Sequence, residues 1–230
     1  MDRAQGHVDV EIDDCGREQA EAAAAALAAL RPVRLWSSDL TRAQQTAAYL
    51  EKATGLTAEA DERLREFDLG ARSGLTRPEF AERYPREFAA WEAGAEGPLV
   101  PGEETRTAVA ARVGPAVGEM LAALAPGETG LAVVHGACLK VALAVQLGWP
   151  LEQGWTLKGM DNGAWAVLVQ GAGEERPRLA AYKRDGVARS HAPAGSTPTR
   201  FRDACRRWLG CSSLSWPVRR PTTSGLWRSW

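Results

Sequence analysis

Residues 33–46 read VRLWSSDLTRAQQT, and this stretch indicates how the chain folds. The apolar run Val33–Trp36 is typical of a short buried strand. The polar residues that follow it, Ser37 to Asp39, are of the types that begin helices, and a helix is predicted from Leu40 to Ala53, ending at Gly55. The sequence therefore predicts a strand that leads directly into a helix, which is the repeating unit of an α/β domain.

The same arrangement returns later in the chain. Leu131–Val134 is a second apolar run that predicts a buried strand, and residues 137–147 are expected to form the helix after it. Further helices are predicted over 16–30, 78–91 and 105–124, and late strands over 164–169 and 179–182, while residues 57–66 are expected to lead from a short strand into a loop. The alternation predicts a three-layer α/β/α sandwich with a mostly parallel sheet.

Composition places the chain among ordinary globular proteins. It has 230 residues, 45% hydrophobic and 25% charged, with a net charge of -1. That charge gives no general attraction to nucleic acid or to a membrane, and no apolar run reaches membrane-spanning length. The N-terminus shows no signal-peptide pattern, so a cytoplasmic location is expected. The four cysteines form no Cys-x-x-Cys pair, and neither a metal site nor a cofactor is predicted.

The chain is predicted to consist of one domain and a tail. Residues 1–189 carry the α/β pattern, whereas residues 190–230 are rich in Arg, Ser and Trp and show no sustained periodicity. The tail is therefore expected to be irregular and disordered. A second interpretation is an interaction module, because Arg interleaved with Trp is able to bind single-stranded nucleic acid, but the tail lacks a recognisable fold.

Three positions have the character of an active site. Arg42 is expected in the first turn of its helix, where it reaches the sheet edge and can hold a phosphate in bidentate fashion. Glu66 lies among bulky apolar residues, which suits a general acid. His135 follows a buried strand and precedes Gly136 and a helix, a favourable place to meet an anion. Each has a plainer alternative, namely a surface ion pair for Arg42, a solvated loop charge for Glu66 and a hydrogen-bonded buried imidazole for His135.

The order and spacing of these segments resemble the histidine phosphatase superfamily, whose fold is phosphoglycerate-mutase-like. The matching pieces are Ser-Ser-Asp-Leu-x-Arg-Ala-x-x-Thr at 37–46, Leu-Arg-Glu-x-x-x-Gly at 64–70 and Val-x-His-Gly at 133–136. An early segment, Gln5-Gly6-His7-x-Asp9, also looks like the family's. The resemblance covers roughly residues 4–185, and the Ser-Ser-Asp segment is its most specific part.

The resemblance implies a phosphomonoester hydrolase that acts through a phosphohistidine on a small phosphorylated metabolite. Arg42, His135 and Gly136 then correspond to the phosphate pocket, and His135 and Glu66 to catalytic residues, with Glu66 as the acid that protonates the leaving oxygen. A phosphoglycerate-mutase-type phosphotransferase is the alternative reaction. The short loop over 93–103 favours the phosphatase.

The chain departs from the family at the nucleophile. The family begins with an internal strand that ends in Arg-His-Gly, whereas this sequence starts past that point and contains no Arg-His-Gly. Its histidines are His7, His135 and His191. The first strand of the sheet is therefore expected to be missing, which would leave neighbouring strands without partners and make the chain poorly stable, inactive or both. A phosphate-binding protein without turnover is the corresponding alternative function.

Overall fold

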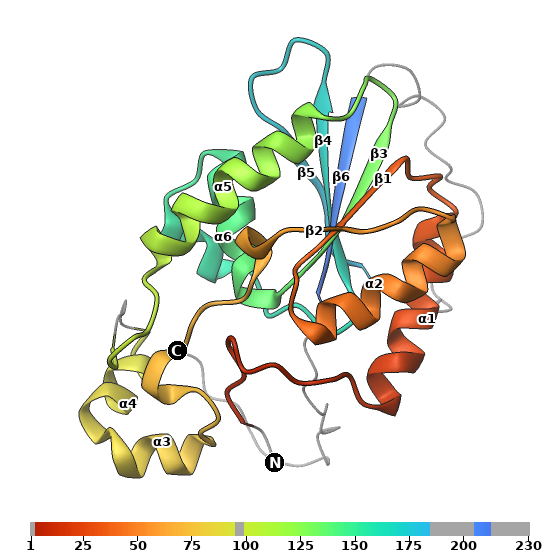
Figure 1. The fold of residues 1–230 in the computed structure, drawn as a ribbon. Coiled ribbons are helices and arrows are strands. Elements are labelled where there is room, and N and C mark those ends of the chain that lie inside the picture. Colours follow the sequence, from red (N-terminus) through yellow and green to blue (C-terminus); the bar gives the residue numbers. More distant parts are fainter. Residues whose placement is uncertain (1–2, 95–98, 185–204, 213–230) are drawn as a thin grey trace, which may run out of the picture.

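The computed structural model describes residues 3–94 and 99–184 with their side chains and the backbone of residues 205–212 (Figure 1). The helices are α1 (Asp14–Ala28), α2 (Thr41–Thr54), α3 (Arg77–Arg83), α4 (Pro85–Glu92), α5 (Arg106–Ala122) and α6 (Gly136–Leu147). The strands are β1 (Arg34–Ser37), β2 (Glu59–Ala60), β3 (Thr129–Val134), β4 (Trp165–Gly171), β5 (Arg178–Arg184) and β6 (Cys205–Ser212). Short 3₁₀ turns occupy Glu62–Leu64, Gly70–Arg72 and Leu151–Thr156.

The strands form one mixed sheet in the order β2-β1-β3-β6-β4-β5. The pairs β1–β2, β1–β3 and β3–β6 are parallel, whereas β4 is antiparallel to both β6 and β5. The α/β class with a largely parallel sheet, predicted from the sequence, is confirmed.

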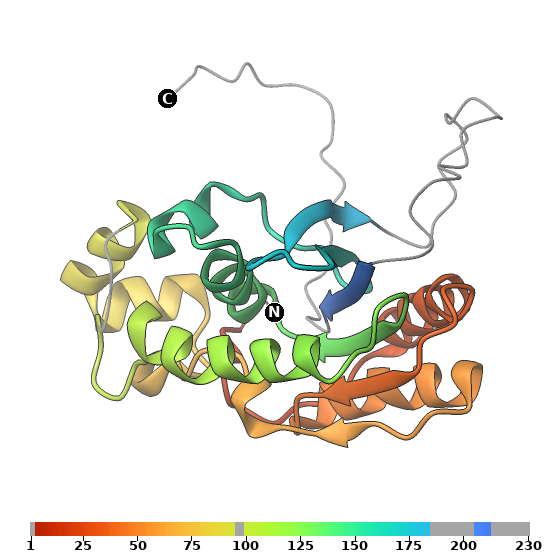
Figure 2. The ribbon, with the colours of Figure 1, turned by 90° about the horizontal axis from the view of Figure 1, so that it is seen from above.

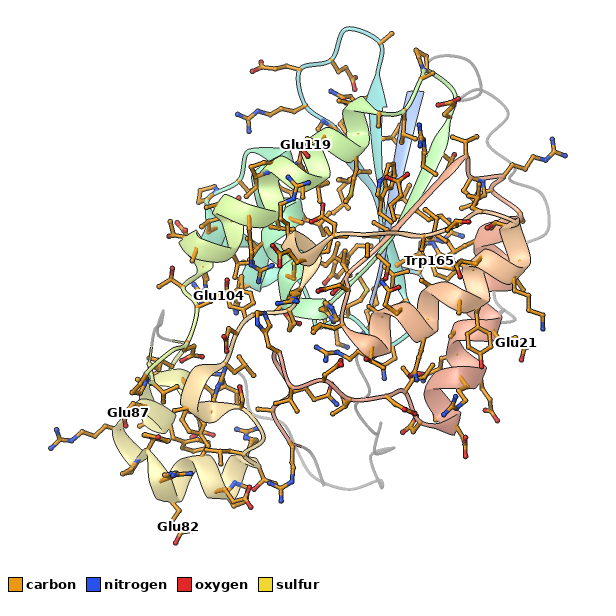
Figure 3. All side chains as sticks on the ribbon, in the orientation of Figure 1. Glu21, Glu82, Glu87, Glu104, Glu119 and Trp165 are labelled. Carbon is orange, nitrogen blue, oxygen red and sulfur yellow. The ribbon has the colours of Figure 1, made fainter. Side chains whose placement is uncertain are left out.

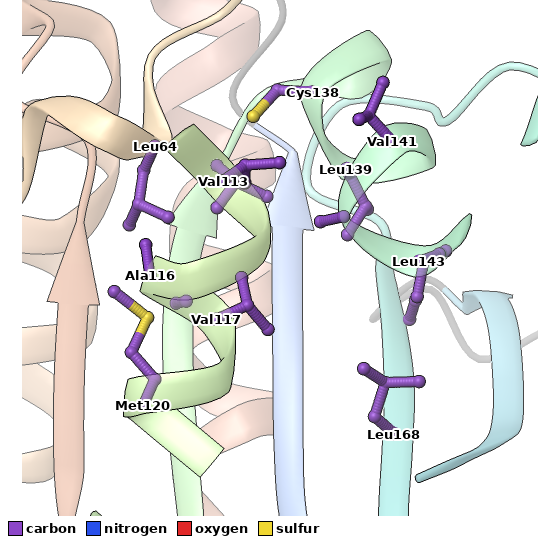
Figure 4. Packing of buried hydrophobic residues seen from close by; sticks show 14 of the residues in the cluster. Leu64, Val113, Ala116, Val117, Met120, Cys138, Leu139, Val141, Leu143 and Leu168 are labelled. Carbon is purple, nitrogen blue, oxygen red and sulfur yellow. The ribbon is translucent and has the colours of Figure 1, made fainter. Parts of the chain in front are cut away.

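The alternation of side chains along β3 creates two cores, one on each face of the sheet. Leu131 and Val133 pack with α1 and α2, whereas Ala132 and Val134 pack with α5 and α6. The helices accordingly lie on opposite sides of the sheet (Figures 1 and 2). Figure 4 shows the second core, where apolar side chains of α5 and α6 gather beside the strands. The structure therefore has the predicted three layers.

Strand β6 comes from the segment that was expected to be an irregular tail. It lies between β3 and β4, with Thr129 opposite Arg207 and Val134 opposite Ser212 on one side, and Trp165 opposite Cys211 on the other. The prediction of an irregular segment is wrong for residues 205–212, and the rest of 190–230, including His191, lies outside the described residues. β3 and β4 therefore both have a backbone partner, contrary to the expected gap at a missing first strand.

The helix predicted over 78–91 is in fact two helices that meet at Tyr84 and Pro85. Pro85 has no N–H to continue the ladder and disfavours helical dihedrals in the residue before it. Tyr84 accordingly has φ -137° and ψ 64°, outside the helical region. The break turns α4 back toward α3, and Phe80 of α3 packs against Phe88 and Trp91 of α4.

None of the helices in the described part of the chain is long and apolar enough to cross a membrane.

The position of β6 predicts that the sheet depends on residues 205–212. Deleting 205–230 should remove the partner of both β3 and β4 and leave buried N–H and C=O groups unpaired, at about 1–3 kcal/mol each. We expect the thermal midpoint, measured by circular dichroism, to fall by at least about 10 °C, or cooperative melting to be lost.

Deleting only 213–230 is the matched control, because it leaves β6 in place. The control should melt close to the full chain. Equal midpoints for the two truncated chains would show that β6 contributes nothing to the sheet.

Candidate active site

The candidate residues converge at the edge of the sheet where β1 and β3 end. Ser38 follows β1 and precedes α2, and His135 follows β3 and precedes α6. Because β1 and β3 are parallel neighbours, the N-termini of α2 and α6 open toward the same edge. The carboxyl edge of parallel strands is the usual place for ligands in α/β proteins, and helix N-termini there favour anions.

His135 is fully buried at this edge. Its Nε2 atom lies 2.9 Å from the hydroxyl oxygen of Ser38. Burial lowers its pKa well below the ordinary value, and the positive charges of Arg42 and Arg112 lower it further. The imidazole is therefore neutral at pH 7. One of its ring nitrogens donates a hydrogen bond and the other accepts one.

Arg42 is also fully buried, in the first turn of α2 as the sequence predicted. Its guanidinium donates to the backbone carbonyl oxygens of Gly6 at 2.7 Å and Val8 at 3.1 Å, so the N-terminal segment covers it. Its Nε has no hydrogen-bond partner within the described part of the chain. Burial lowers the pKa of Arg42, while the negative charges of Glu66 and Asp9 oppose that effect.

Glu66 is buried at the N-terminus of α6. One carboxylate oxygen accepts the Ala137 N–H at 3.0 Å, and the other accepts the Cys138 N–H at 2.9 Å and the Phe67 N–H at 3.0 Å. The Glu66 side chain thus satisfies helix N–H groups that have no acceptor inside α6. Glu66 is therefore an anchored group and not a solvated loop charge.

The structure brings together all four residues that the sequence singled out. Arg42 interacts electrostatically with both Glu66 and His135, and Gly136 is the buried first residue of α6. The alternative of a surface ion pair does not describe Arg42, because it is buried and forms no ion pair with a carboxylate of the described residues. His135 is both buried and hydrogen-bonded, as its plainer alternative required.

Two further residues of the site were not predicted as such. The guanidinium of Arg112, on α5, donates to the carbonyl oxygens of Arg63, Arg65 and Glu66 and pairs with Glu104 at 2.8 Å. His7 lies with its Nε2 2.7 Å from the Glu66 carbonyl oxygen. Both residues fix the backbone that carries Glu66.

No local motif marks Arg112, which belongs to an amphipathic helix where an arginine ordinarily faces solvent. His7 was seen as part of the early segment, but its contact with Glu66 spans 59 positions of sequence. Within the residues that the structure describes, no group of three or more His, Cys, Asp or Glu side chains is placed to hold a metal ion.

Comparison with known proteins gives the family. The model of the histidine phosphatase superfamily (branch 1) matches residues 1–183. This chain belongs to the histidine phosphatase superfamily. The match covers both halves of the domain, including the segments of Arg42, Glu66 and His135.

Named relatives of this histidine phosphatase include both phosphatases and mutases. Glucosyl-3-phosphoglycerate phosphatase of Mycobacterium tuberculosis is 38% identical over 173 residues, 72% of this chain and 77% of the relative. A probable phosphoglycerate mutase of Yersinia pestis is 34% identical over 153 residues, 64% of this chain and 68% of the relative. The solved structure of mycobacterial glucosyl-3-phosphoglycerate phosphatase with inorganic phosphate matches with a TM-score of 0.71 and 36% identity, covering 80% of this chain and 93% of that one.

The anchoring of Glu66 predicts a measurable contribution to stability. Glu66→Ala removes the acceptor of three backbone N–H groups, two of them in the first turn of α6. We expect the free energy of unfolding, measured with urea, to fall by about 2–4 kcal/mol. Glu62→Ala is the control, since Glu62 is an exposed glutamate of the preceding turn, and it should change the value by less than about 0.5 kcal/mol. Equal effects of the two substitutions would contradict the anchoring role.

Proposed function

We propose that this histidine phosphatase binds a small phosphomonoester at the edge formed by Arg42, His135 and α6, and that the site is built for hydrolysis of the ester. The observation that carries the proposal is Arg42. A fully buried guanidinium is costly unless its charge and its N–H groups are satisfied, yet its Nε has no partner within the described residues. A phosphate oxygen would supply the missing acceptor together with a further negative charge.

The roles of the other residues follow from their places. The neutral imidazole of His135 offers a hydrogen bond to a phosphate oxygen without adding a second cation to the buried site. Gly136 begins α6, whose dipole favours an anion at the same point. The Glu66 carboxyl group lies beside them, and its proposed role is to give a proton to the leaving oxygen.

The proposed reaction is the family's transfer through a histidine. A histidine nitrogen forms a bond to phosphorus as the ester P–O bond breaks, and the carboxyl proton of Glu66 passes to the leaving oxygen. Water then attacks the phosphohistidine, its proton returns to the carboxylate, and inorganic phosphate is released with the histidine restored. The relatives named glucosyl-3-phosphoglycerate phosphatase favour this hydrolysis over transfer to a second substrate, and we propose a small phosphorylated metabolite as the substrate.

A second candidate function, binding of the phosphomonoester without turnover, is favoured by the histidines themselves. His135 is fully buried against Ser38, and His7 is engaged with the Glu66 carbonyl oxygen. The Nε2 atom of each imidazole is thus already engaged with another group of the chain. The alternative to hydrolysis is therefore a chain that binds phosphate esters at this site with little or no turnover.

Two measurements test the two candidate functions. Isothermal titration with inorganic phosphate tests binding at the site, and a phosphate-release assay on p-nitrophenyl phosphate tests hydrolysis. We expect the full chain to bind phosphate and Arg42→Lys to bind it at least about tenfold more weakly, because a lysine ammonium cannot reproduce the directed Nε–H of a planar guanidinium whose other nitrogens bond Gly6 and Val8. Arg34→Lys, an exposed arginine of β1, is the matched control and should bind like the parent. Thermal melts verify that each variant is folded.

Unchanged phosphate binding in folded Arg42→Lys would refute the site. Release of phosphate from the ester by the full chain, abolished in Glu66→Gln, would refute binding without turnover and leave the hydrolase.

A further inference from the structure

A cavity of about 390 Å³ extends from the candidate site toward α3 and α4. Glu66 and Ala137 line this cavity and meet at the N-terminus of α6, so the cavity reaches the end of the helix at which the phosphate is proposed to bind. Its volume falls in the range that holds small organic ligands. Apolar and aromatic side chains supply much of its wall, namely Ala4, Phe67, Leu69, Leu75, Phe80, Trp91, Leu99 and Trp155.

Two tryptophans from different elements line the cavity. Trp155 follows α6 and is 37% exposed, with the edge of Phe67 packed against it at a centroid distance of 6.1 Å. Trp91 belongs to α4 and is fixed by Phe80, whose ring centroid is 6.1 Å away. Aromatic rings held in this way offer rigid apolar surface to a ligand at little cost in side-chain entropy.

Most charged residues of the wall have an ion-pair partner in the wall or beside it, although the Arg72 Nε has no hydrogen-bond partner among the described residues. The Arg72 guanidinium pairs with Glu103 at 2.8 Å and lies 5.6 Å from the centre of the Trp91 ring. Glu104, which Figure 3 shows on the segment leading into α5, is paired with Arg112. Glu103 also accepts the N–H groups of Leu99 and Val100, which leaves its carboxylate little capacity for a ligand.

The two other arginines of the wall, Arg77 and Arg106, also have partners. Arg77 pairs with Glu92 at 2.7 Å, and the Arg106 guanidinium lies 4.2 Å from the centre of the Trp155 ring. The wall holds three arginines and the three glutamates Glu66, Glu103 and Glu104. A second anionic group on a ligand would therefore meet as many negative as positive charges, whereas an apolar group would gain from burial against the rings.

We propose that this cavity selects phosphomonoesters whose organic part is aromatic or otherwise apolar and carries no second anionic group, with Trp155 and Trp91 as specificity-determining residues. The inference rests on the proposed phosphate site and adds the substrate class. It differs from what the relatives' names suggest, because 3-phosphoglycerate derivatives carry a carboxylate beside the phosphate.

Binding of three phosphonates that are not hydrolysed tests the proposal by titration calorimetry on the full chain. 2-Phenylethylphosphonate should bind at least about tenfold more tightly than ethylphosphonate, because the phenyl ring is buried in the cavity. 2-Carboxyethylphosphonate should bind no more tightly than ethylphosphonate. Trp155→Ala should reduce the phenyl preference to within about twofold and leave the dissociation constant of inorganic phosphate unchanged.

Trp149→Ala is the matched control, a tryptophan near the end of α6 that does not line the cavity, and it should keep the preference. Trp91→Leu is a second test of the cavity wall, should Trp155→Ala fail to fold.

Three outcomes would overturn the proposal while leaving the phosphate site intact. They are equal binding of 2-phenylethylphosphonate and ethylphosphonate, tighter binding of 2-carboxyethylphosphonate than of ethylphosphonate, and an unchanged phenyl preference in both Trp91→Leu and Trp155→Ala. Failure of inorganic phosphate and all three phosphonates to bind would overturn the phosphate site as well.

Discussion

The carboxylate of Glu66 at the N-terminus of α6 is the interaction on which the arrangement of the site depends. It joins a loop that follows β2 to the helix that follows β3, over 71 positions of sequence for the Ala137 bond. Arg112 and His7 hold the backbone of the same residue from α5 and from the N-terminal segment. Four distant parts of the chain therefore meet around one glutamate, which also lines the cavity.

This convergence is possible because β3 is buried on both faces and paired on both edges. Its apolar alternation attaches one helical layer to each face, and its carboxyl end delivers His135 and α6 to the same edge as Ser38 and α2. The charge of Arg42 is consequently held where water has little access, which strengthens its attraction for an anion. The fold thus produces an anion site from groups that would be ordinary surface charges elsewhere.

The sequence predicted the parts of this fold that local patterns determine. The apolar runs before Ser37 and before His135 are bounded by helix-starting residues, so both strands and the helices after them were predicted, and Arg42 was placed in its first turn correctly. Pro85 carried enough information to divide the helix over 78–91, but the aromatic spacing on both sides of it favoured one continuous helix.

Long-range contacts account for what the sequence did not predict. β6 gains its structure from pairing with β3 and β4, and its own composition, with adjacent arginines and a glycine, lacks the alternation of a recognisable strand. The three N–H groups that Glu66 accepts and the carbonyl groups that Arg112 binds become neighbours only in the folded chain.

The central claim is that Arg42 and the N-terminus of α6 form a phosphate site, and a crystal structure of the full chain with inorganic phosphate tests it most directly. The account predicts a phosphate at the start of α6, with one oxygen within hydrogen-bond distance of the Arg42 guanidinium and another near His135. Phosphate bound elsewhere, with Arg42 still bonded only to the Gly6 and Val8 carbonyl oxygens, would contradict it.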